Sequence, residues 1–321
     1  MNYSQILSQQ FNIKEEYAKN IITLLDDGNT IPFIARYRKE MHGSMDDQLI
    51  REFAEKLEYL RGLDKRRDEI RSLIDAQEKL TDEINLALDK AATLSELEDI
   101  YRPYRPKRKT RASIAKEKGL EPLANDILKQ EKGFDPSKSA VDYIDEEKGV
   151  TSVEDAIQGA MDIIAELVSD NAEIRKRIRN LTNANGVLVS VATDEEKDSV
   201  YKNYYDYKEP VKKIAGHRVL AVNRGEKEGF LKVSVETDSE KPLNSIFRAM
   251  ITDKNQLCSD IIREACTDAY QRLIYPSIER EVRNDLTDTA SENAMKVFAV
   301  NLKQLLMQPP VKGKTVLALD P

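Results

Sequence analysis

The residues of this 321-residue chain with the clearest chemical potential are basic, and they gather in one short stretch. Pro103 and Pro106 stiffen the backbone there. Eight basic residues lie between positions 102 and 118, and the only acid among them is Glu117. The basic residues are Arg102, Arg105, Lys107, Arg108, Lys109, Arg111, Lys116 and Lys118. Because the whole chain has a net charge of −7, this stretch predicts an anionic partner, internal or external.

Three interpretations of this basic segment, residues 102–118, stay open. It binds nucleic-acid phosphates, or it is an ordinary solvated face, or it pairs with an acidic stretch of the same chain. The carboxylates of that stretch are Asp194, Glu195, Glu196, Asp198, Asp206 and Glu209. Tyr101 and Tyr104 either stack on bases or anchor the proline-rich hinge on neighbouring helices. The candidate nucleic-acid-binding residues are Arg102, Arg105, Lys107, Arg108, Lys109 and Arg111, with Arg36, Arg38 and Lys39 as a second group.

Catalytic patterns are not evident in the sequence. The two histidines, His42 and His217, are far apart, and no HExxH, CxxC or phosphate-cradling glycine motif occurs. We therefore expect no catalytic, cofactor-binding or metal-binding residue, and no cofactor. A structural role is expected for His42, and His217 is expected to act as a polar cap at the start of a helix. Cys258 and Cys266 are expected to be buried or inert thiols in a reducing compartment.

Helix-start signals predict the elements that carry these residues. Capping residues are expected at Asn12, Asp46 with Asp47, Thr81, Ser95, Thr110 and Thr151. Gly119 is expected to end the short helix that follows Thr110. Three helices with short turns, at about 12–75, are similar to a helix-turn-helix unit, although any small helical bundle gives the same pattern.

The pattern changes after Gly186. Residues 187–191 and 230–235 are typical of strands, which predicts a small α/β insert. Two long helices are then expected, at about 257–274 and 277–306, separated by Pro276. A sustained apolar face is expected on the second, formed by Val282, Leu286, Ala290, Ala294, Val297, Val300 and Leu305. Residues 315–319 are typical of a buried strand.

Composition favours a mainly α protein. Apolar residues make up 40% of the chain and charged residues 33%, with no Trp, which suits an assembly of amphipathic helices. No apolar run approaches the roughly 20 residues that span a bilayer. The first ten residues do not resemble a signal peptide. A cytoplasmic protein with no membrane partner is expected.

Four segments, taken together, resemble the Tex family of bacterial transcription accessory proteins. They are IPFIARYRKEMHG (31–43), LEDIYRPYRPKRKTRASIAKEKGLEPLA (97–124), HRVLAVNRGEKEGFLKVSV (217–235) and FAVNLKQLLMQPPVKGKTVLALDP (298–321). The resemblance implies a non-enzymatic scaffold that acts in transcription through RNA or DNA and the transcription machinery. It also implies that this chain is an N-terminal fragment, with an RNase H-like YqgF domain, helix-hairpin-helix repeats and an RNA-binding OB-fold module further on.

The expected organisation follows from the elements and the resemblance together. A helical region is expected over 1–185, the α/β insert over 186–242, a long-helix support over 243–310, and the truncated first strand of the YqgF domain over 311–321. Asp320 resembles the first metal-binding Asp of RNase H-like nucleases. The alternative function is therefore the N-terminal part of a structure-selective, metal-dependent nuclease. Nucleic-acid binding through this chain is expected to be weak and non-specific.

Overall fold

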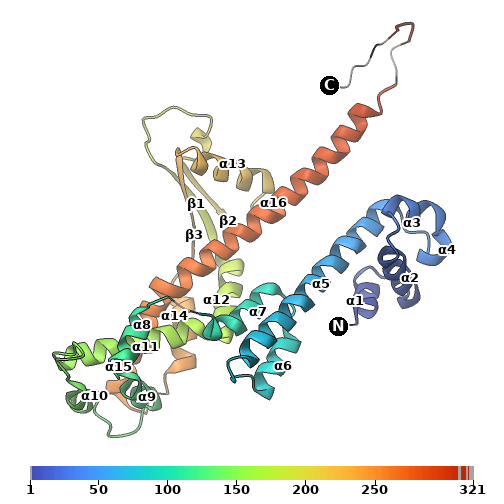
Figure 1. The fold of residues 1–321 in the computed structure, drawn as a ribbon. Coiled ribbons are helices and arrows are strands. Elements are labelled where there is room, and N and C mark those ends of the chain that lie inside the picture. Colours follow the sequence, from blue (N-terminus) through green and yellow to red (C-terminus); the bar gives the residue numbers. More distant parts are fainter. Residues whose placement is uncertain (1, 107, 253, 310–311, 316, 318–321) are drawn as a thin grey trace. The chain divides into compact units, whose positions relative to one another are not determined.

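The computed structural model describes residues 2–106, 108–252, 254–309, 312–315 and 317. It is mainly helical, as predicted, and divides into two compact units, Met1–Pro106 and Lys107–Pro321 (Figure 1). The position of one unit relative to the other is not determined. The domain boundaries given above from the sequence therefore stay predictions.

The first unit is entirely helical where it is described. Its helices are α1 (Tyr3–Gln10), α2 (Glu15–Asp26), α3 (Ile31–Tyr37), α4 (Lys39–His42), α5 (Asp47–Asp75), α6 (Asp82–Lys90), α7 (Leu94–Tyr101) and the 3-10 turn η1 (Arg102–Tyr104). Helix α5 belongs to two cores: its first half packs Phe53 and Leu57 against α1–α4, and its second half packs Ile70 and Ile74 against α6 and α7. A 29-residue helix is thus stabilised by burial along its whole length.

Local capping explains where several helices of this unit begin. The Asp46 side chain accepts from the Leu49 amide at 2.7 Å, and Thr81 caps α6, both as predicted. Two predicted caps were wrong. Asn12 has a left-handed φ of 51° and α2 begins after Lys14, while Thr93, two residues before Ser95, caps α7.

The second unit holds the remaining helices and the sheet. Its helices are α8 (Arg111–Glu117), α9 (Glu121–Lys129), α10 (Pro136–Ala140), η2 (Val141–Tyr143), α11 (Val153–Asp170), α12 (Ala172–Asn185), η3 (Lys202–Tyr204), α13 (Gly216–Lys227), α14 (Glu240–Met250), α15 (Gln256–Asp268) and α16 (Tyr275–Leu306). Ser152 caps α11, and not its neighbour Thr151, whose hydroxyl instead donates to Asp155. One large core joins α8–α12 to α14–α16.

A three-stranded antiparallel sheet of order β2-β1-β3 lies within this unit (Figure 1). The central strand β1 (Val187–Ala192) and the edge strand β3 (Leu231–Glu236) confirm the two predicted strands. The other edge strand, β2 (Asp206–Pro210), was not predicted, because its sequence DYKEP has no apolar alternation. Helix α13 covers one face, where Val222, Leu231 and Val233 form a separate small core. These elements form the insert.

Helix α16 follows α15 through a π-helical stretch, Ala269–Ile274, in place of the break predicted at Pro276. Pro276 lies in the first turn of α16, where its missing amide costs no helical hydrogen bond. The insert lies close to this helix: a Cβ added to Gly216 would meet the Ala290 Cα at 3.2 Å. Only glycine fits here without a shift of α13 away from α16.

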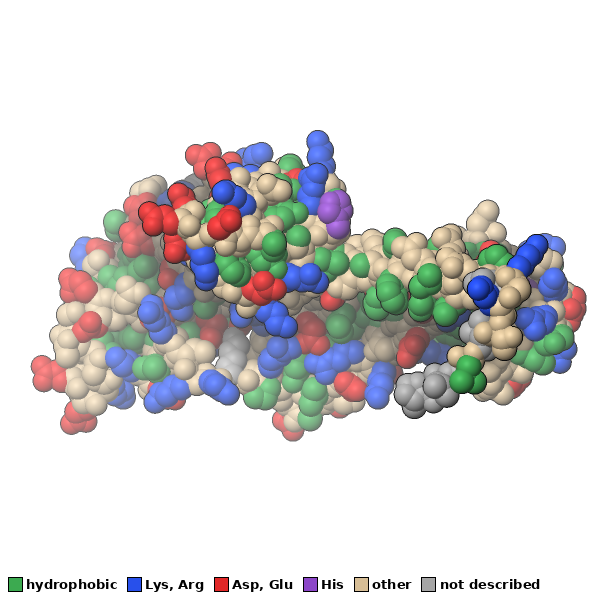
Figure 2. Space-filling view, turned by 90° about the horizontal axis from the view of Figure 1, so that it is seen from above, with side chains coloured by type: hydrophobic (Ala, Val, Ile, Leu, Met, Phe, Trp, Pro, Cys, Tyr) green, Lys and Arg blue, Asp and Glu red, His purple; other side chains and the backbone are tan. Residues whose placement is uncertain are grey.

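The apolar face predicted along α16 is buried only in its first half. Val282 and Ala290 are 1% and 3% exposed, whereas Val297, Val300 and Leu305 are 62%, 57% and 61% exposed. Figure 2 shows hydrophobic side chains along the projecting helix. None of the described helices is both long enough and apolar enough to cross a membrane. The predicted strand 315–319 cannot be assessed, because 316, 318, 319 and Asp320 lie outside the described residues.

Candidate nucleic-acid interface

The second-unit part of the basic segment lies at the start of α8. Thr110 caps this helix in a reciprocal capping box with Ser113, at 2.8 and 3.0 Å, and Gly119 follows its end, both as predicted. Arg108, Lys109 and Arg111 are exposed around this rigid cap. Lys109 lies 3.6 Å from Glu117, but both side chains are more than 60% exposed, so the pair leaves the ammonium accessible. Lys107 lies outside the described residues.

Within the second unit, the described ion pairs and hydrogen bonds of residues 108–118 do not involve the acidic stretch at 194–209. Lys116 pairs with Glu121 at 2.9 Å, and Lys118 donates to the Gly149 carbonyl at 2.7 Å. Glu209 of the acidic stretch instead accepts from Arg218 at 3.0 Å. The described partners of residues 108–118 thus lie outside the acidic stretch, which favours phosphate binding or a solvated face for this part of the segment.

The first-unit part of the segment is held more tightly. Arg105 pairs with Glu98, which also accepts from Arg66 at 2.7 Å. Both guanidinium groups lie over the Tyr101 ring, at 5.6 and 5.7 Å from its centroid. Tyr101 is 6% exposed and packs in the core of α5–α7, so it anchors the hinge and is not available to stack on a base. Arg102 is half-buried in η1.

The second basic group is divided between α3 and α4. Arg38 joins these helices and lies over the Phe33 ring at 5.3 Å. Arg36 and Lys39 are exposed and line a hollow of about 450 Å³ that also includes Asp46 and Asp47. Because both acids face the same hollow, the electrostatic attraction for a phosphate is weaker here than at α8.

The histidines have different environments. His42 is fully buried, with Nε2 3.1 Å from the Ile34 carbonyl, which agrees with a structural role. His217 does not cap α13: it is the second, exposed residue of that helix, and Ala215 occupies the cap position.

The thiols of Cys258 and Cys266 are buried, and burial raises the pKa of Cys266 to about 12, so it stays protonated at neutral pH.

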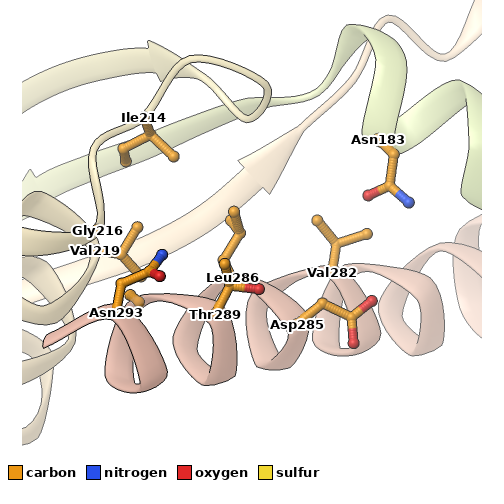
Figure 3. A pocket seen from close by; sticks show the side chains of 10 residues that line it. Asn183, Ile214, Gly216, Val219, Val282, Asp285, Leu286, Thr289 and Asn293 are labelled. Carbon is orange, nitrogen blue, oxygen red and sulfur yellow. The ribbon is translucent and has the colours of Figure 1, made fainter. Parts of the chain in front are cut away.

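A cavity of about 210 Å³ lies between the insert, the end of α12 and the side of α16 (Figure 3). Ile214 and Asn183 point into it from above, and Val282 and Leu286 rise from α16. Burial raises the pKa of Asp285 at its edge, and the Glu281 and Asp288 charges raise it further, against Arg179. This site was not predicted from the sequence, because its lining comes from three segments far apart in the chain.

The chain matches two family models. The model of the Tex-like protein N-terminal domain matches residues 1–75, and the Tex central region-like model matches residues 131–298, more than half of the chain. The chain belongs to the Tex family. The first match coincides with α1–α5, and the second includes the insert and most of α16. The basic segment 102–118 of this Tex-family chain lies between the two matched ranges.

Relatives agree with this assignment. The chain is 36% identical, over its whole length, to "Transcriptional accessory protein Tex" of Neisseria gonorrhoeae, of which it covers 43%. It is 44% identical to the uncharacterized protein YdcI of Bacillus subtilis, with 99% of this chain and 44% of that protein aligned. The human "S1 RNA-binding domain-containing protein 1" is 31% identical, with 99% of this chain and 33% of that protein aligned. The Tex-family chain thus spans less than half the length of these relatives.

Proposed function

We propose that this chain forms the scaffold part of a Tex-like transcription accessory factor that acts through nucleic acid and the transcription machinery. The observation that carries the proposal is the similarity, over the whole length of this chain, to part of a protein named a transcriptional accessory protein. The name of the human relative supports an association with RNA. The structure offers a matching surface, because Arg108, Lys109 and Arg111 stand exposed on the capped start of α8.

The binding that we propose for this surface is weak and independent of sequence. Lysine and arginine contacts to phosphates release counterions from the nucleic acid but do not distinguish bases. Each phosphate that the protein neutralises adds about 0.7 to the slope of log affinity against log salt for single strands, and about 0.9 for duplexes. Most binding by this chain is therefore expected below physiological salt.

Fluorescence anisotropy tests this function directly. Labelled single-stranded RNA, single-stranded DNA and duplex DNA are titrated with the whole chain at several salt concentrations. We expect affinity that falls steeply with salt and varies little among unrelated sequences. No detectable binding at low salt would contradict the proposal.

We also propose that the chain is not an enzyme. In the described part of the chain, no three His, Cys, Asp or Glu side chains converge as a metal site requires. Labelled RNA and DNA incubated with the chain in Mg²⁺ or Mn²⁺ are expected to stay intact. Cleavage that a single substitution in this chain abolishes would favour the nuclease alternative.

A further inference from the structure

A tight turn next to the cavity of Figure 3 has the features of a ligand site. It joins β2 to α13, and its backbone is fixed by bonds from Lys213 N and Ile214 N to the Pro210 carbonyl, at 2.9 and 3.1 Å. Val211 anchors it further through a 2.8 Å bond to Gly186. Lys212 and Lys213 are exposed on this fixed turn. The turn therefore presents two ammonium groups from a rigid base.

The positive charge of this turn is not neutralised locally. Neither Lys212 nor Lys213 forms an ion pair with a described carboxylate, and the nearest acid in sequence, Glu209, is engaged by Arg218 and Tyr207. A phosphate that approaches the turn thus meets free cationic groups.

The cavity directly follows these lysines in the chain, since Ile214 and Gly216 form part of its wall. Ile214, Val219, Val282 and Leu286 supply apolar surface. Polar groups complete the wall, with no side-chain hydrogen bond between them and another described residue, and Asp285 also feels the charge of Arg179; they are Asn183, Asp285, Thr289 and Asn293. Its volume of about 210 Å³ is smaller than the roughly 300–1,000 Å³ of drug-sized sites, which suits one flat ring system.

We propose that this turn and cavity form a binding site for single-stranded nucleic acid. The backbone phosphates lie on Lys212 and Lys213, and one unstacked base enters the cavity. Apolar side chains contact the faces of the base, while amide, hydroxyl and carboxylate groups pair with its edge. A duplex does not fit, because its bases stay stacked. This inference rests on the proposed function, and it adds a second contact site, separate from α8.

Two variants test the two halves of the site. Lys212→Glu with Lys213→Glu removes the phosphate contacts, and Thr289→Phe fills the cavity from an exposed position of α16. The matched control is Lys132→Glu with Lys254→Glu. Both lysines are exposed, and they come from two segments that are joined by a hydrogen bond from Asn255 to the Glu131 carbonyl at 2.7 Å. A thermal melt of each variant confirms that it folds.

The probes are a labelled, unstructured 12-nucleotide RNA, its duplex, and the same strand with abasic positions, measured by anisotropy with the whole chain. We expect the native chain to prefer the intact single strand to both others at least fivefold. The lysine variant is expected to reduce the salt slope by about 1.4, at about 0.7 per phosphate, and the control to leave it unchanged. Thr289→Phe is expected to abolish the preference for the intact strand.

The site is overturned if the lysine variant and its control behave alike, or if Thr289→Phe keeps the preference. Binding that persists in both variants and is lost on charge reversal at α8 would leave the proposed function standing without this site. If the native chain binds none of the three probes, the proposed function falls as well.

Discussion

At the residue scale, a buried and a half-buried arginine show how the second unit is held together. Arg175 on α12 is fully buried and donates to Ser277 at 3.0 Å and to Glu281 on α16 at 2.7 Å. Arg179, one turn further on, donates to the other oxygen of Glu281 at 2.9 Å. One carboxylate thus joins α12 to α16. The sequence shows these charges but not their pairing, because the partners lie about 100 residues apart.

Removing that carboxylate is expected to destabilise the chain strongly. Glu281→Ala removes the carboxylate that the buried Arg175 shares with Arg179, which costs about 3 kcal/mol, the lower end of the range for breaking a buried pair, because Glu281 is partly exposed. Urea unfolding measures the change. Glu264→Ala, an exposed change on α15, is the control and is expected to cost less than about 0.5 kcal/mol. Equal effects of the two changes would contradict the proposed role of Glu281.

Asp162 on α11 is expected to make stability depend on pH. Burial raises its pKa above the ordinary value of 3.8, against the positive charges of Arg272 and Arg111. The folded state therefore binds the proton more tightly than the unfolded chain. The contribution of Asp162 is favourable below pH 3.8 and is lost as pH rises through its folded pKa.

Asp162→Asn should remove that contribution. The unfolding free energy of the native chain, relative to Asp162→Asn, should fall as pH rises above 3.8 and then become constant. Urea unfolding from pH 4 to pH 7 measures this difference. If the unfolding free energy of the native chain minus that of the variant rises over the same interval, the pairing of Asp162 with Arg272, 3.6 Å away, outweighs the effect of burial on the pKa.

At the element scale, the starts of several helices were predictable from a local capping residue. Thr110 and Asp46 satisfy the first amides of their helices through local contacts. The cap of α7 was misplaced because Thr93 and Ser95 are both suitable residues, and local sequence does not decide between them. Strand β2 was missed because its pairing to β1, and not its own composition, makes it a strand.

Helix α16 shows a further limit of sequence periodicity. An apolar repeat predicts an apolar face but not whether another element covers it. Val282→Ala is expected to cost about 2 kcal/mol, because it removes two buried methyl groups and leaves a small cavity.

Val297→Ala on the same helix provides the matched comparison. Its side chain is 62% exposed, so the change is expected to cost less than about 0.5 kcal/mol. Urea unfolding of the two variants measures how much unfolding free energy each substitution removes. A large loss from Val297→Ala would mean that the outer half of α16 is covered in solution.

At the scale of the whole molecule, the sequence identified the family and the charged segment but not the surface that the segment makes. The segment crosses the boundary between the two units at residues 106 and 107. Arg105 on one side is paired over Tyr101, and Arg108 on the other side is exposed. The turn at Lys212 and Lys213 lay outside the sequence prediction, because two adjacent lysines carry no signal until the cavity beside them is known.

The central claim is that exposed basic residues of this chain bind nucleic-acid phosphates. The most direct measurement compares the native chain with Arg108→Glu/Lys109→Glu, by anisotropy on one labelled single strand at several salt concentrations and by thermal melting. We expect an unchanged melting temperature and a salt slope reduced by about 1.4, at about 0.7 for each lost phosphate contact. A lowered melting temperature with an unchanged salt slope would show that these residues serve the fold, and would contradict the claim.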